Sequence, residues 1–566
     1  MAGLSSLSSA LESIDSGNEE KVQDALVKIL SECDSNNAVG ADLINCGIMP
    51  ALAALVNAVP ACQSKIADLV ATLARTETAR SPAVHAGLVP LLVDVLRSDD
   101  KEKVKQSLRA LGNICFDNDE GREALLRADG VVVIGGILED EAKDETVQEE
   151  RLELFRPLCG CVLNMMTGYD AVAEACIEAD IPNSIVQIIR HHGSTDIGLC
   201  RVLIMTLDSI LEGAQEPGAN ALREAGAVTV IVRLLGAVED SSVKELIIET
   251  LASAAQNELW QLALAAQGCV SHLLRQFQLD VDGAVTLTSD VSRKVMDLIV
   301  MLLTGDESLR ILFSQGNGPI LPVVCNWLKS SDEKVLSSGA LAIGNMARSD
   351  TNCSVLLEKG VLALLLAVLE KYSSKEDNVE VLHGALSAIR NLSMPAASKE
   401  HLASKDVPSQ IVPLVYHVAQ PVQQKSLGAL RLMVDGQESV ATALGSQAEL
   451  AARLVDLSSH PDIGVSSEAQ RLIASLIKNS RTDTVGSTFL AADVVKSLAA
   501  LGESQHVIMV HEAIMACNIL VVACKDSAPA AMRDGGVQKI ATDIANDPEV
   551  GVELKSNAQT LVDALR

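Results

Sequence analysis

Aromatic residues are scarce in this chain of 566 residues. Phe, Trp and Tyr together account for 2% of the sequence, whereas hydrophobic residues as a whole account for 48%. A sheet core of this size would draw on aromatic and β-branched side chains, so the interior has to be built from Leu, Ala, Val and Ile, as in packed helices. Proline is also rare, with 16 residues, and no long Gly-, Ser- or Pro-rich linker divides the chain. The sequence therefore predicts one continuous helical architecture, although its length alone would suggest several domains.

Positive charge is in short supply as well, because the formal net charge is −29. Neutralisation of phosphates by Lys and Arg normally holds a protein on nucleic acid or on an anionic membrane, so we expect no nucleic-acid partner and no direct membrane insertion. The apolar run from Val361 to Leu369 is too short to span a bilayer, and the first residues lack the features of a signal peptide. These features predict a cytoplasmic protein with a basic partner, although the acidity can equally serve solubility alone.

Sequence motifs of covalent chemistry are missing. The chain has no GxxxxGK[ST] phosphate-binding loop, no GxSxG nucleophile and no HExxH metal motif. Its 13 cysteines are scattered singly through aliphatic runs, and the one close pair, Cys159 and Cys161, has no second pair at zinc-binding spacing. We therefore expect no catalytic residue, no metal and no cofactor, and buried free thiols in a reducing compartment. The protein is predicted to bind rather than to catalyse.

A short phrase recurs along the chain and gives the strongest signal in the sequence. A small residue and a Gly are followed by two apolar residues and then by a run that ends in paired aliphatics. Clear copies are NCGIMPALAALV from Asn45, HAGLVPLLVDVL from His85, RADGVVVIGGIL from Arg127, REAGAVTVIVRLL from Arg223 and LEKGVLALLLAVL from Leu357. The copies are spaced by roughly 40 to 50 residues, which is the period of armadillo and HEAT solenoids.

Each repeat has a simple physical interpretation. The Gly supplies a sharp bend, the aliphatic run after it forms one helix, and a polar loop leads into a longer third helix. Three-helix units with a Gly bend favour armadillo over HEAT, and such units must stack to bury their apolar faces. We therefore predict an all-α, right-handed superhelical armadillo solenoid of about a dozen three-helix repeats. Residues 1–40 should form capping helices, and residues 41–566 should form the continuous solenoid.

An asparagine recurs in the middle of several predicted third helices. The examples are Asn113, Asn164, Asn345, Asn391 and Asn518. In the helix around Asn345, a wheel of 100° per residue places four residues toward the core, namely Ala340, Ile343, Gly344 and Ala347. The same wheel places Ser338, Ala342 and Ser349 in the sector of the amide, with Arg348 at its border. Because third helices line the inner face of an armadillo solenoid, the amides should form a polar row there. Two roles are open, bonding to a neighbouring repeat or gripping the main chain of a partner.

Two kinds of armadillo groove fit poorly. Importin-type grooves pair Trp with Asn on successive third helices, but the only tryptophans here are Trp260 and Trp327, and Trp327 falls in a predicted second helix. Catenin-type grooves are strongly basic, which the net charge of −29 opposes. A transport receptor of importin type is therefore disfavoured.

Several longer phrases resemble one family in particular. They occur in the same order from the first repeats to the last, so the resemblance covers nearly the whole chain. The phrases are RALGNICFDNDEGR from Arg109, LIVMLLTGDESLRILF from Leu298, GALAIGNMARSDTNC from Gly339, HGALSAIRNLSMP from His383, LGALRLMVDGQ from Leu427 and SQHVIMVHEAIMA from Ser504. They are similar to the SmgGDS family of small-GTPase GDP-dissociation stimulators, called Vimar in insects. The similarity is specific at GDES and at ARSDTNC, which a generic armadillo repeat does not require.

This resemblance implies a guanine-nucleotide exchange factor and chaperone for small GTPases of the Rho and Rap type, preferably prenylated and with a polybasic tail. It implies that the repeats of residues 216–566 form a groove that binds the GTPase and weakens its affinity for GDP, and that the repeats of residues 41–215 form a prenyl pocket. It also implies a cytoplasmic protein that reaches the nucleus or a membrane-bound organelle together with its GTPase. The competing hypothesis is a non-catalytic armadillo scaffold that binds basic partners without stimulating nucleotide release.

The family's functional residues carry over to specific positions of this sequence. The positions that the resemblance assigns to GTPase binding are Asn345, Asn391 and Arg348. The positions assigned to an acidic patch for the polybasic tail are Asp208, Glu212 and Glu249. The positions assigned to the prenyl chain are Leu108, Cys115, Cys161 and Met165. For each residue of this last set, ordinary core packing is the alternative role.

Overall fold

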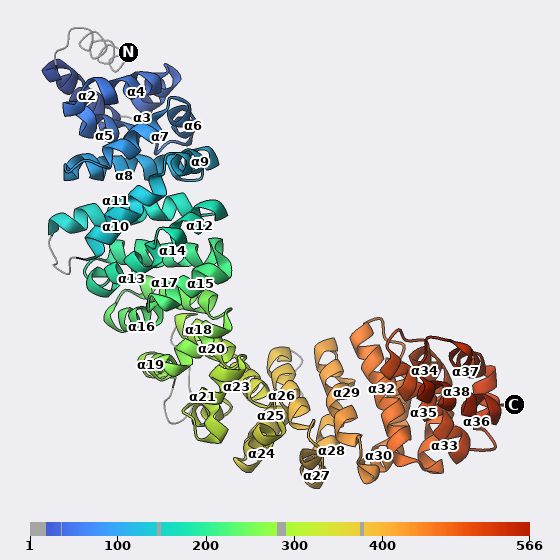
Figure 1. Cartoon of the computed structure of the whole chain (residues 1–566). Coiled ribbons are helices and arrows are strands. Elements are labelled where there is room, and N and C mark those ends of the chain that lie inside the picture. The colour runs from blue at the N-terminus through green and yellow to red at the C-terminus, as the bar shows by residue number, and fades with distance from the viewer. Residues whose placement is uncertain (1–18, 36, 144–148, 280–289, 374–377) are drawn as a thin grey trace. The chain divides into compact units, whose positions relative to one another are not determined.

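The fold is helical throughout the residues that the computed structural model describes, which are 19–35, 37–143, 149–279, 290–373 and 378–566. These ranges contain α-helices and short 3-10 helices and no strand. The chain divides into two compact units, Met1–Gln276 and Phe277–Arg566. Figure 1 shows the helices in chain order, coloured from blue to red. The first residues of the predicted N-terminal cap, 1–18, lie outside the described residues, whereas α2 (Glu19–Ser35) is described.

The helices after α2 fall, in chain order, into about a dozen sets of three. The first helices are α3 (Asn37–Asn45), α6 (Glu77–His85), α9 (Asp119–Arg127), α12 (Asp170–Glu178), α15 (Gln215–Glu224), α18 (Glu258–Ala266), α21 (Asp306–Phe313), α24 (Asp350–Glu358), α27 (Ala396–Ser404), α30 (Glu438–Gly445), α33 (Asp483–Ala491) and α36 (Ala528–Asp534). The second helices are α4 (Ile48–Ala58), α7 (Leu88–Val95), α10 (Gly130–Ala142), α13 (Ile181–His192), α16 (Ala227–Ala237), α19 (Cys269–Gln276), α22 (Ile320–Trp327), α25 (Val361–Tyr372), α28 (Val407–Ile411), α31 (Ala448–Leu457), α34 (Val495–Gly502) and α37 (Val537–Asn546).

The third helices are the ones that carry the recurrent asparagines. They are α5 (Gln63–Leu73), α8 (Lys101–Cys115), α11 (Glu149–Met166), α14 (Ile197–Gly213), α17 (Ser241–Ala254), α20 (Asp290–Leu302), α23 (Glu333–Met346), α26 (Val379–Leu392), α29 (Gln420–Val434), α32 (Ile463–Ser480), α35 (Val507–Ala523) and α38 (Val552–Ala564). Three short 3-10 helices lie between the α-helices, η1 (Pro60–Cys62), η2 (Ser314–Gly316) and η3 (Val412–Tyr416). The predicted three-helix repeat is confirmed by this succession.

The bend that leads into most second helices contains a residue in the left-handed region. Gly87, with φ 74°, precedes α7, and Gly360, with φ 77°, precedes α25, as the recurrent phrase predicts. Asp129, with φ 55°, takes this place before α10. The expectation that the Gly makes the bend in every copy is therefore wrong here, because Gly130 is already the first residue of α10. Asp adopts the left-handed conformation more readily than most side chains, since its short polar group can bond locally.

Five of the third helices, α8, α14, α17, α23 and α32, begin at an Asp side chain that caps them. The carboxylate of Asp100 accepts the N–H groups of Glu102 and Lys103, and the carboxylate of Asp332 accepts those of Lys334 and Val335. Such caps satisfy backbone donors that have no partner inside the first turn of a helix. In these helices the cap fixes the first residue, and therefore the register of the side chains that the helix presents.

Third helices stack directly on one another within each unit (Figure 1). In the first unit α5, α8, α11, α14 and α17 pack in succession, and in the second unit α20, α23, α26, α29, α32, α35 and α38 do so. Each third helix inside one of these rows thus has another third helix on two flanks and shorter helices behind it, so only a narrow strip of its surface is open. We call this strip, on any third helix, its open strip.

The tryptophans lie in the core. Trp260 on α18 and Trp327 on α22 are completely buried. The indole N–H of Trp260 donates to the Ala219 carbonyl at 2.7 Å, and that of Trp327 donates to the Leu279 carbonyl at 2.9 Å. Buried indoles need such a partner, and these bonds hold both rings away from the open strips.

Within the described residues, no single helix is both long and apolar enough to cross a membrane. Three bent pairs of helices reach that length and composition together, namely Ala38–Asn45 with Ile48–Ala58, Asp350–Glu358 with Val361–Tyr372, and Asp483–Ala491 with Val495–Gly502.

Candidate functional site

The recurrent asparagines tie each third helix to the one before it. In the first unit, Asn113 Nδ2 donates to the Ala71 carbonyl at 2.8 Å and Asn164 Nδ2 donates to the Gly112 carbonyl at 3.0 Å. Each acceptor lies in the last turn of the preceding third helix. The Gly112 carbonyl also accepts the N–H of Phe116, so the amide of Asn164 is its second donor. The amides therefore fix the stacking of one third helix on the next.

The second unit repeats the same bond. Asn345 Nδ2 donates to the Val300 carbonyl at 3.1 Å, and Asn391 Nδ2 donates to the Gly344 carbonyl at 3.0 Å. Asn518 differs, because its Nδ2 donates forward to the Asn557 carbonyl at 2.9 Å. Of the two roles open for these amides, the stacking role is the one that the structure contains. An amide has a second N–H and an oxygen, so one bond to a neighbour leaves Asn345 and Asn391 able to bind a partner as well.

The register predicted for α23 is wrong on one side. Ile343 and Ala347 are buried as expected, but Ser338 and Ala342, which were placed beside Asn345 on an exposed sector, are buried too. The exposed side chain next to the amide is Leu341, at 41%. A helical wheel treats the helix as lying on one surface, whereas α23 is flanked by both α20 and α26, so its open strip is narrower and is rotated toward Leu341.

Gly344, which the wheel places toward the core, is half-buried and faces the next third helix instead. A Cβ at this position would lie 3.9 Å from the Ala388 backbone of α26. The small residue lets α26 approach closely enough for Asn391 to reach the Gly344 carbonyl. Close packing and the amide bond are thus two parts of one contact.

Arg348, the third residue assigned to GTPase binding, lies just beyond the end of α23. Its guanidinium donates to the Thr304 carbonyl and lies 3.3 Å from the Asp306 carboxylate. Its side chain is 45% exposed, so it belongs to the open surface while holding two successive repeats together. The structure therefore places Asn345, Leu341 and Arg348 along one open strip.

A hollow opens beside this strip on α20, α23 and α26. The residues that line it are Arg293, Asp297, Lys334, Ser337, Ser338, Leu341, Glu380 and His383. Burial raises the pKa of the Asp297 carboxyl, and burial together with the nearby Lys425 lowers the pKa of His383. Both shifts show that water has restricted access to this part of the surface. A partner that enters the hollow would meet an apolar side chain surrounded by charges of both signs.

The three carboxylates assigned to an acidic patch do lie together. Asp208 and Glu212 are on α14, and Glu249 is on the adjacent α17. Burial raises the pKa of Asp208 to about 6, and the charges of Glu212 and Glu249 raise it further. A carboxyl whose pKa is raised this far marks a place where negative charges lie close together. A cationic group would relieve that repulsion.

The residues assigned to a prenyl chain lie in the closed core of the first unit. The side chains of Leu108, Cys115, Cys161 and Met165 are at most 1% exposed. They fill the contact between α8 and α11, which is so close that a Cβ on Gly112 would lie 3.1 Å from the Cys161 backbone. Burial raises the pKa of the Cys115 thiol to about 12. Ordinary core packing, the alternative considered for these residues, is their role in this conformation.

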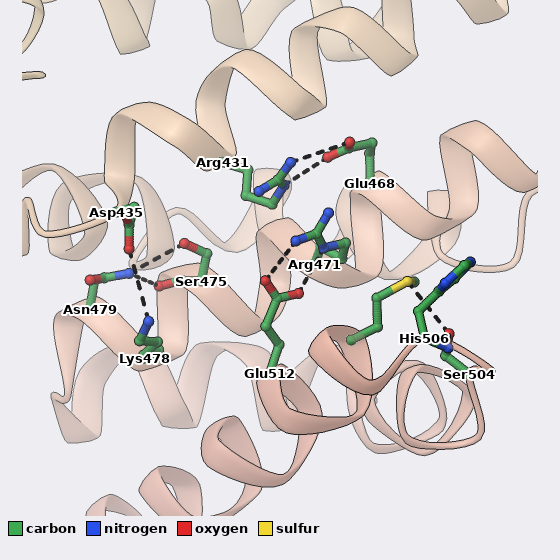
Figure 2. Close-up of polar contacts among 11 residues, drawn as sticks. Arg431, Asp435, Glu468, Arg471, Ser475, Lys478, Asn479, Ser504, His506 and Glu512 are labelled. Carbon is green, nitrogen blue, oxygen red and sulfur yellow. Dashed lines mark hydrogen bonds and ion pairs between the residues drawn. The ribbon is translucent and has the colours of Figure 1, made fainter. Parts of the chain in front are cut away.

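Sequence reasoning missed a set of ion pairs between the last third helices. Arg431 of α29 binds Glu468 of α32 at 2.8 Å, and Arg471 of α32 binds Glu512 of α35 at 2.7 Å (Figure 2). These helices carry Leu432 and Ser475 where α23 and α26 carry the stacking asparagine, counted from the residue that begins each helix. Counted from the end of the helix, however, α32 has Asn479 at the place of Asn345 and Asn391, and its Oδ1 accepts the N–H of Gly436 at 2.9 Å. The ion pairs therefore add to the contacts between these helices.

Part of the signal for these pairs was present in the sequence. Glu468 and Arg471 stand three residues apart on one helix, so they lie on the same face and can reach toward the two flanking helices. The partners are 37 and 41 residues away, and their match depends on the register between helices, which spacing alone does not give. Within the described residues, no three His, Cys, Asp or Glu side chains gather as ligands for a metal ion.

The chain is similar to known proteins over nearly its whole length. The family model for the Armadillo/beta-catenin-like repeat matches residues 79–116. The chain is 31% identical to Rap1 GTPase-GDP dissociation stimulator 1-A of Xenopus laevis, over 99% of this chain and 92% of that protein. It is 27% identical to the GTPase-GDP dissociation stimulator vimar of Drosophila melanogaster, over 81% of this chain and 77% of that protein.

A solved structure shares the fold. It comes from work on the interaction between cadherin and beta-catenin, and it covers 91% of this chain and 98% of its own with a TM-score of 0.53. The sequences are 14% identical, so the likeness concerns the armadillo architecture alone.

Proposed function

Because the chain belongs to the family of GTPase-GDP dissociation stimulators, we propose that it is a guanine-nucleotide exchange factor and chaperone for prenylated small GTPases. The GTPases are of the Rho and Rap type and carry a polybasic tail. They bind in the groove formed by the open strips of α20, α23 and α26, and the protein acts on them without covalent chemistry. It works in the cytoplasm and travels with its GTPase to other compartments.

The acidic patch of Asp208, Glu212 and Glu249 is the observation that carries the proposal. The pKa of Asp208 is raised to about 6, so ionising this group in the free protein is unfavourable. A polybasic segment placed beside the patch would favour the ionised form and would lower that pKa. Attraction of this kind mainly raises the association rate, and it weakens as salt is added.

The groove offers groups suited to a folded partner. Asn345 and Asn391 are anchored by one bond each, so their remaining amide groups are held in place before a partner arrives. Preorganised polar groups lose little entropy on binding. Leu341 supplies an exposed apolar contact one turn before Asn345. This combination supports a grip on a backbone segment of the GTPase.

Exchange follows from such a grip by linkage. A surface that binds the nucleotide-free GTPase more tightly than the GDP-bound form lowers the affinity for GDP by the same factor. No residue of the groove has to touch the nucleotide for this to occur.

The chaperone role requires a change in the first unit. An isoprenoid gains about 0.8 kcal/mol for each buried CH₂ group, so it can compete with the packing of α8 on α11. Leu108 and Met165 would then line the space created between these helices, with the thiols of Cys115 and Cys161 beside them.

The direct test is release of labelled GDP from a purified Rho-type GTPase, prenylated and unprenylated. Acceleration is expected, and more strongly for the prenylated form. Binding without acceleration of GDP release from either form would contradict the exchange role and would favour the scaffold hypothesis.

The acidic patch is tested by reversing its charge. Replacing Asp208, Glu212 and Glu249 by Lys should weaken binding of a polybasic GTPase and flatten the dependence of affinity on salt. The matched control replaces three exposed carboxylates that lie elsewhere, giving an identical change of net charge: Asp94, Asp534 and Asp543. Equal losses in the two variants would show that only net charge matters, and the patch would lose its assigned role.

A further inference from the structure

Large apolar side chains stand exposed at one edge of the second unit. They lie in the loops that lead into four successive third helices, α29, α32, α35 and α38, or at the first residues of these helices. The exposed side chains and their exposed fractions are Tyr416 46%, Val418 68%, Ile463 80%, Val507 68%, Ile508 69% and Val552 86%. We call the four loops, residues 416–421, 459–463, 503–508 and 546–553, the loop edge.

The loop edge forms one row because its helices are parallel neighbours. Arg471, nine residues after the cap of α32, meets Glu512, six residues after the cap of α35. Because the two paired residues lie at similar distances from the starts of their helices, the starts of α32 and α35 lie side by side. Packed helices lie about 8 to 10 Å apart, so the four loops cover a row of about 25 to 30 Å.

The row is particular to this end of the chain. The third helices α8, α17 and α23 begin with Lys101, Ser241 and Glu333 at the position where the last repeats carry Ile463, Val507 and Val552. In the first unit, α14 is the exception among the described third helices, because its first residue, Ile197, is apolar and 57% exposed. Contiguous exposed apolar groups are unfavourable in water, so a run of them in successive repeats indicates a surface that is covered in use.

The loops are already ordered in the free protein. His417 Nδ1 accepts the N–H of Ala419 at 3.0 Å, and His460 Nδ1 accepts the N–H of Asp462 at 3.0 Å. In the third loop, Ser504 Oγ accepts the N–H of His506 at 3.1 Å, as Figure 2 also shows. A partner would therefore meet a preformed row and would not have to order it.

Negative charge prevails in three of the four loops. These three carry carboxylates beside the apolar side chains, and none of the four loops contains Lys or Arg. The carboxylates are Asp462, Glu503, Asp547, Glu549 and Glu553. At the first loop, residues 416–421, the guanidinium of Arg453 lies 5.7 Å from the centre of the Tyr416 ring. A second copy of the chain would bring a like-charged edge, and an anionic membrane would be repelled as well. Charge complementarity favours an occupant whose apolar face is flanked by cations.

We propose that the loop edge is a docking surface for an amphipathic α-helix of a partner protein, apolar on one face and basic along both sides of it. Seven residues of an α-helix advance by about 10.5 Å, close to the spacing of about 8 to 10 Å between successive loops. An apolar residue at every seventh position would thus meet one loop after another, and about 20 residues would cover the whole row.

The ion pairs lie further along the helices than the loop edge does. Arg431 follows the start of α29 by eleven residues, about 16 Å, whereas Glu468 and Glu512 follow the starts of α32 and α35 by five residues, about 7.5 Å. The proposed GTPase groove lies on other third helices, α20, α23 and α26, so the docked helix and the GTPase would use different residues. The inference does not depend on the proposed function.

The test uses the full chain and a labelled 21-residue peptide with Leu at two positions of each heptad and Lys at most others. Fluorescence anisotropy should show binding of this peptide and much weaker binding of two controls, one with the same residues in shuffled order and one with Glu in place of Lys. Equal binding of the shuffled peptide, or tighter binding of the Glu peptide, would overturn the proposal.

Variants locate the surface. Replacing Ile463, Val507 and Ile508 by Ser should weaken peptide binding by about tenfold or more, since all three are exposed contacts at the centre of the row. The matched control is Val522→Ser, which changes a side chain that is 69% exposed at the other end of α35. An effect of the control as large as that of the triple variant would contradict the assignment.

Two further measurements distinguish binding at the loop edge from the effects of misfolding and from binding of other partners. Glu503→Lys should weaken binding of the Lys peptide and strengthen binding of the Glu peptide, whereas loss of structure would weaken binding of both. Hydrogen exchange should slow in residues 459–463 and 503–508 when the peptide is added. The proposal would be refuted if exchange slowed only in α23 and α26. It would also be refuted if the triple variant left peptide affinity unchanged but abolished self-association or binding to phosphatidylserine vesicles.

Discussion

The stacking amide of Asn391 allows a sharp prediction, because a second amide provides a matched control. Asn391→Ala removes the donor that the Gly344 carbonyl receives at 3.0 Å. This carbonyl belongs to the last turn of α23, beyond which no intrahelical donor follows. Losing one bond and leaving a half-buried acceptor without a partner should lower the local stability by about 1 to 2 kcal/mol.

Asn164→Ala removes a bond of the same length in the first unit, to the Gly112 carbonyl. That carbonyl also accepts the N–H of Phe116 at 3.1 Å, so it keeps one partner after the substitution. The expected loss is about 1 kcal/mol or less, which is the net contribution of a single hydrogen bond. The two variants should therefore differ in stability, with Asn391→Ala the more severe.

Hydrogen exchange is the suitable assay, since a solenoid opens locally and a single free energy of unfolding does not describe it. Exchange should accelerate in the last turn of α23 for Asn391→Ala and in the last turn of α8 for Asn164→Ala. Stimulated GDP release should fall only for Asn391→Ala, because only that amide lies on the proposed groove. Unchanged exchange in α23 would refute the stacking role, and equal loss of GDP release in both variants would refute the groove assignment.

Three other outcomes follow from the same geometry. The pKa of Asp208 is raised to about 6, so the closed form of α14 binds this proton more tightly than the open form does. On lowering the pH from 7 to 4, hydrogen exchange should show that α14 of wild type gains about 1 kcal/mol of opening free energy relative to Asp208→Asn once solvent screening is allowed for, and a parallel pH profile of the two would contradict this. A double-mutant cycle on Arg471→Ala and Glu512→Ala should give a coupling of about 1 to 2 kcal/mol, and additive losses would show that the pair contributes nothing. The Cys161 thiol should resist alkylation in the free protein and should become reactive when a prenylated peptide is added, as measured by mass spectrometry. If the thiol stays protected in the presence of the peptide, the proposed lipid site is wrong.

The architecture could be predicted from the sequence because it depends on local signals. Gly87 and Gly360 mark bends that few other residues tolerate, and an aliphatic run after each bend has to form a helix of limited length. The bend at Asp129 was assigned to the neighbouring Gly, since both residue types occur in turns and only the backbone angles separate them. The family resemblance read from longer phrases is confirmed by relatives that span the chain.

The details of the site depend on contacts between repeats, which local signals do not specify. Ala342 was expected on the exposed side, but it is completely buried in a helix that is flanked by both α20 and α26. The pairing of Arg431 with Glu468 joins residues 37 positions apart, and a shift of one residue between the helices would separate them. The acidic cluster around Asp208 was inferred from the resemblance, and the structure brings its members together, while their role in binding stays a prediction.

The stacking amides have a direction, and that direction bears on how the protein is made. The amides of Asn113, Asn164, Asn345 and Asn391 all reach back to a helix that left the ribosome earlier. At about 5 to 20 residues per second, one repeat emerges in roughly 2 to 9 seconds. Each new third helix can then dock at once on a finished template. Asn518 reaches forward to Asn557, so this contact can form only after the following third helix, α38, has been made.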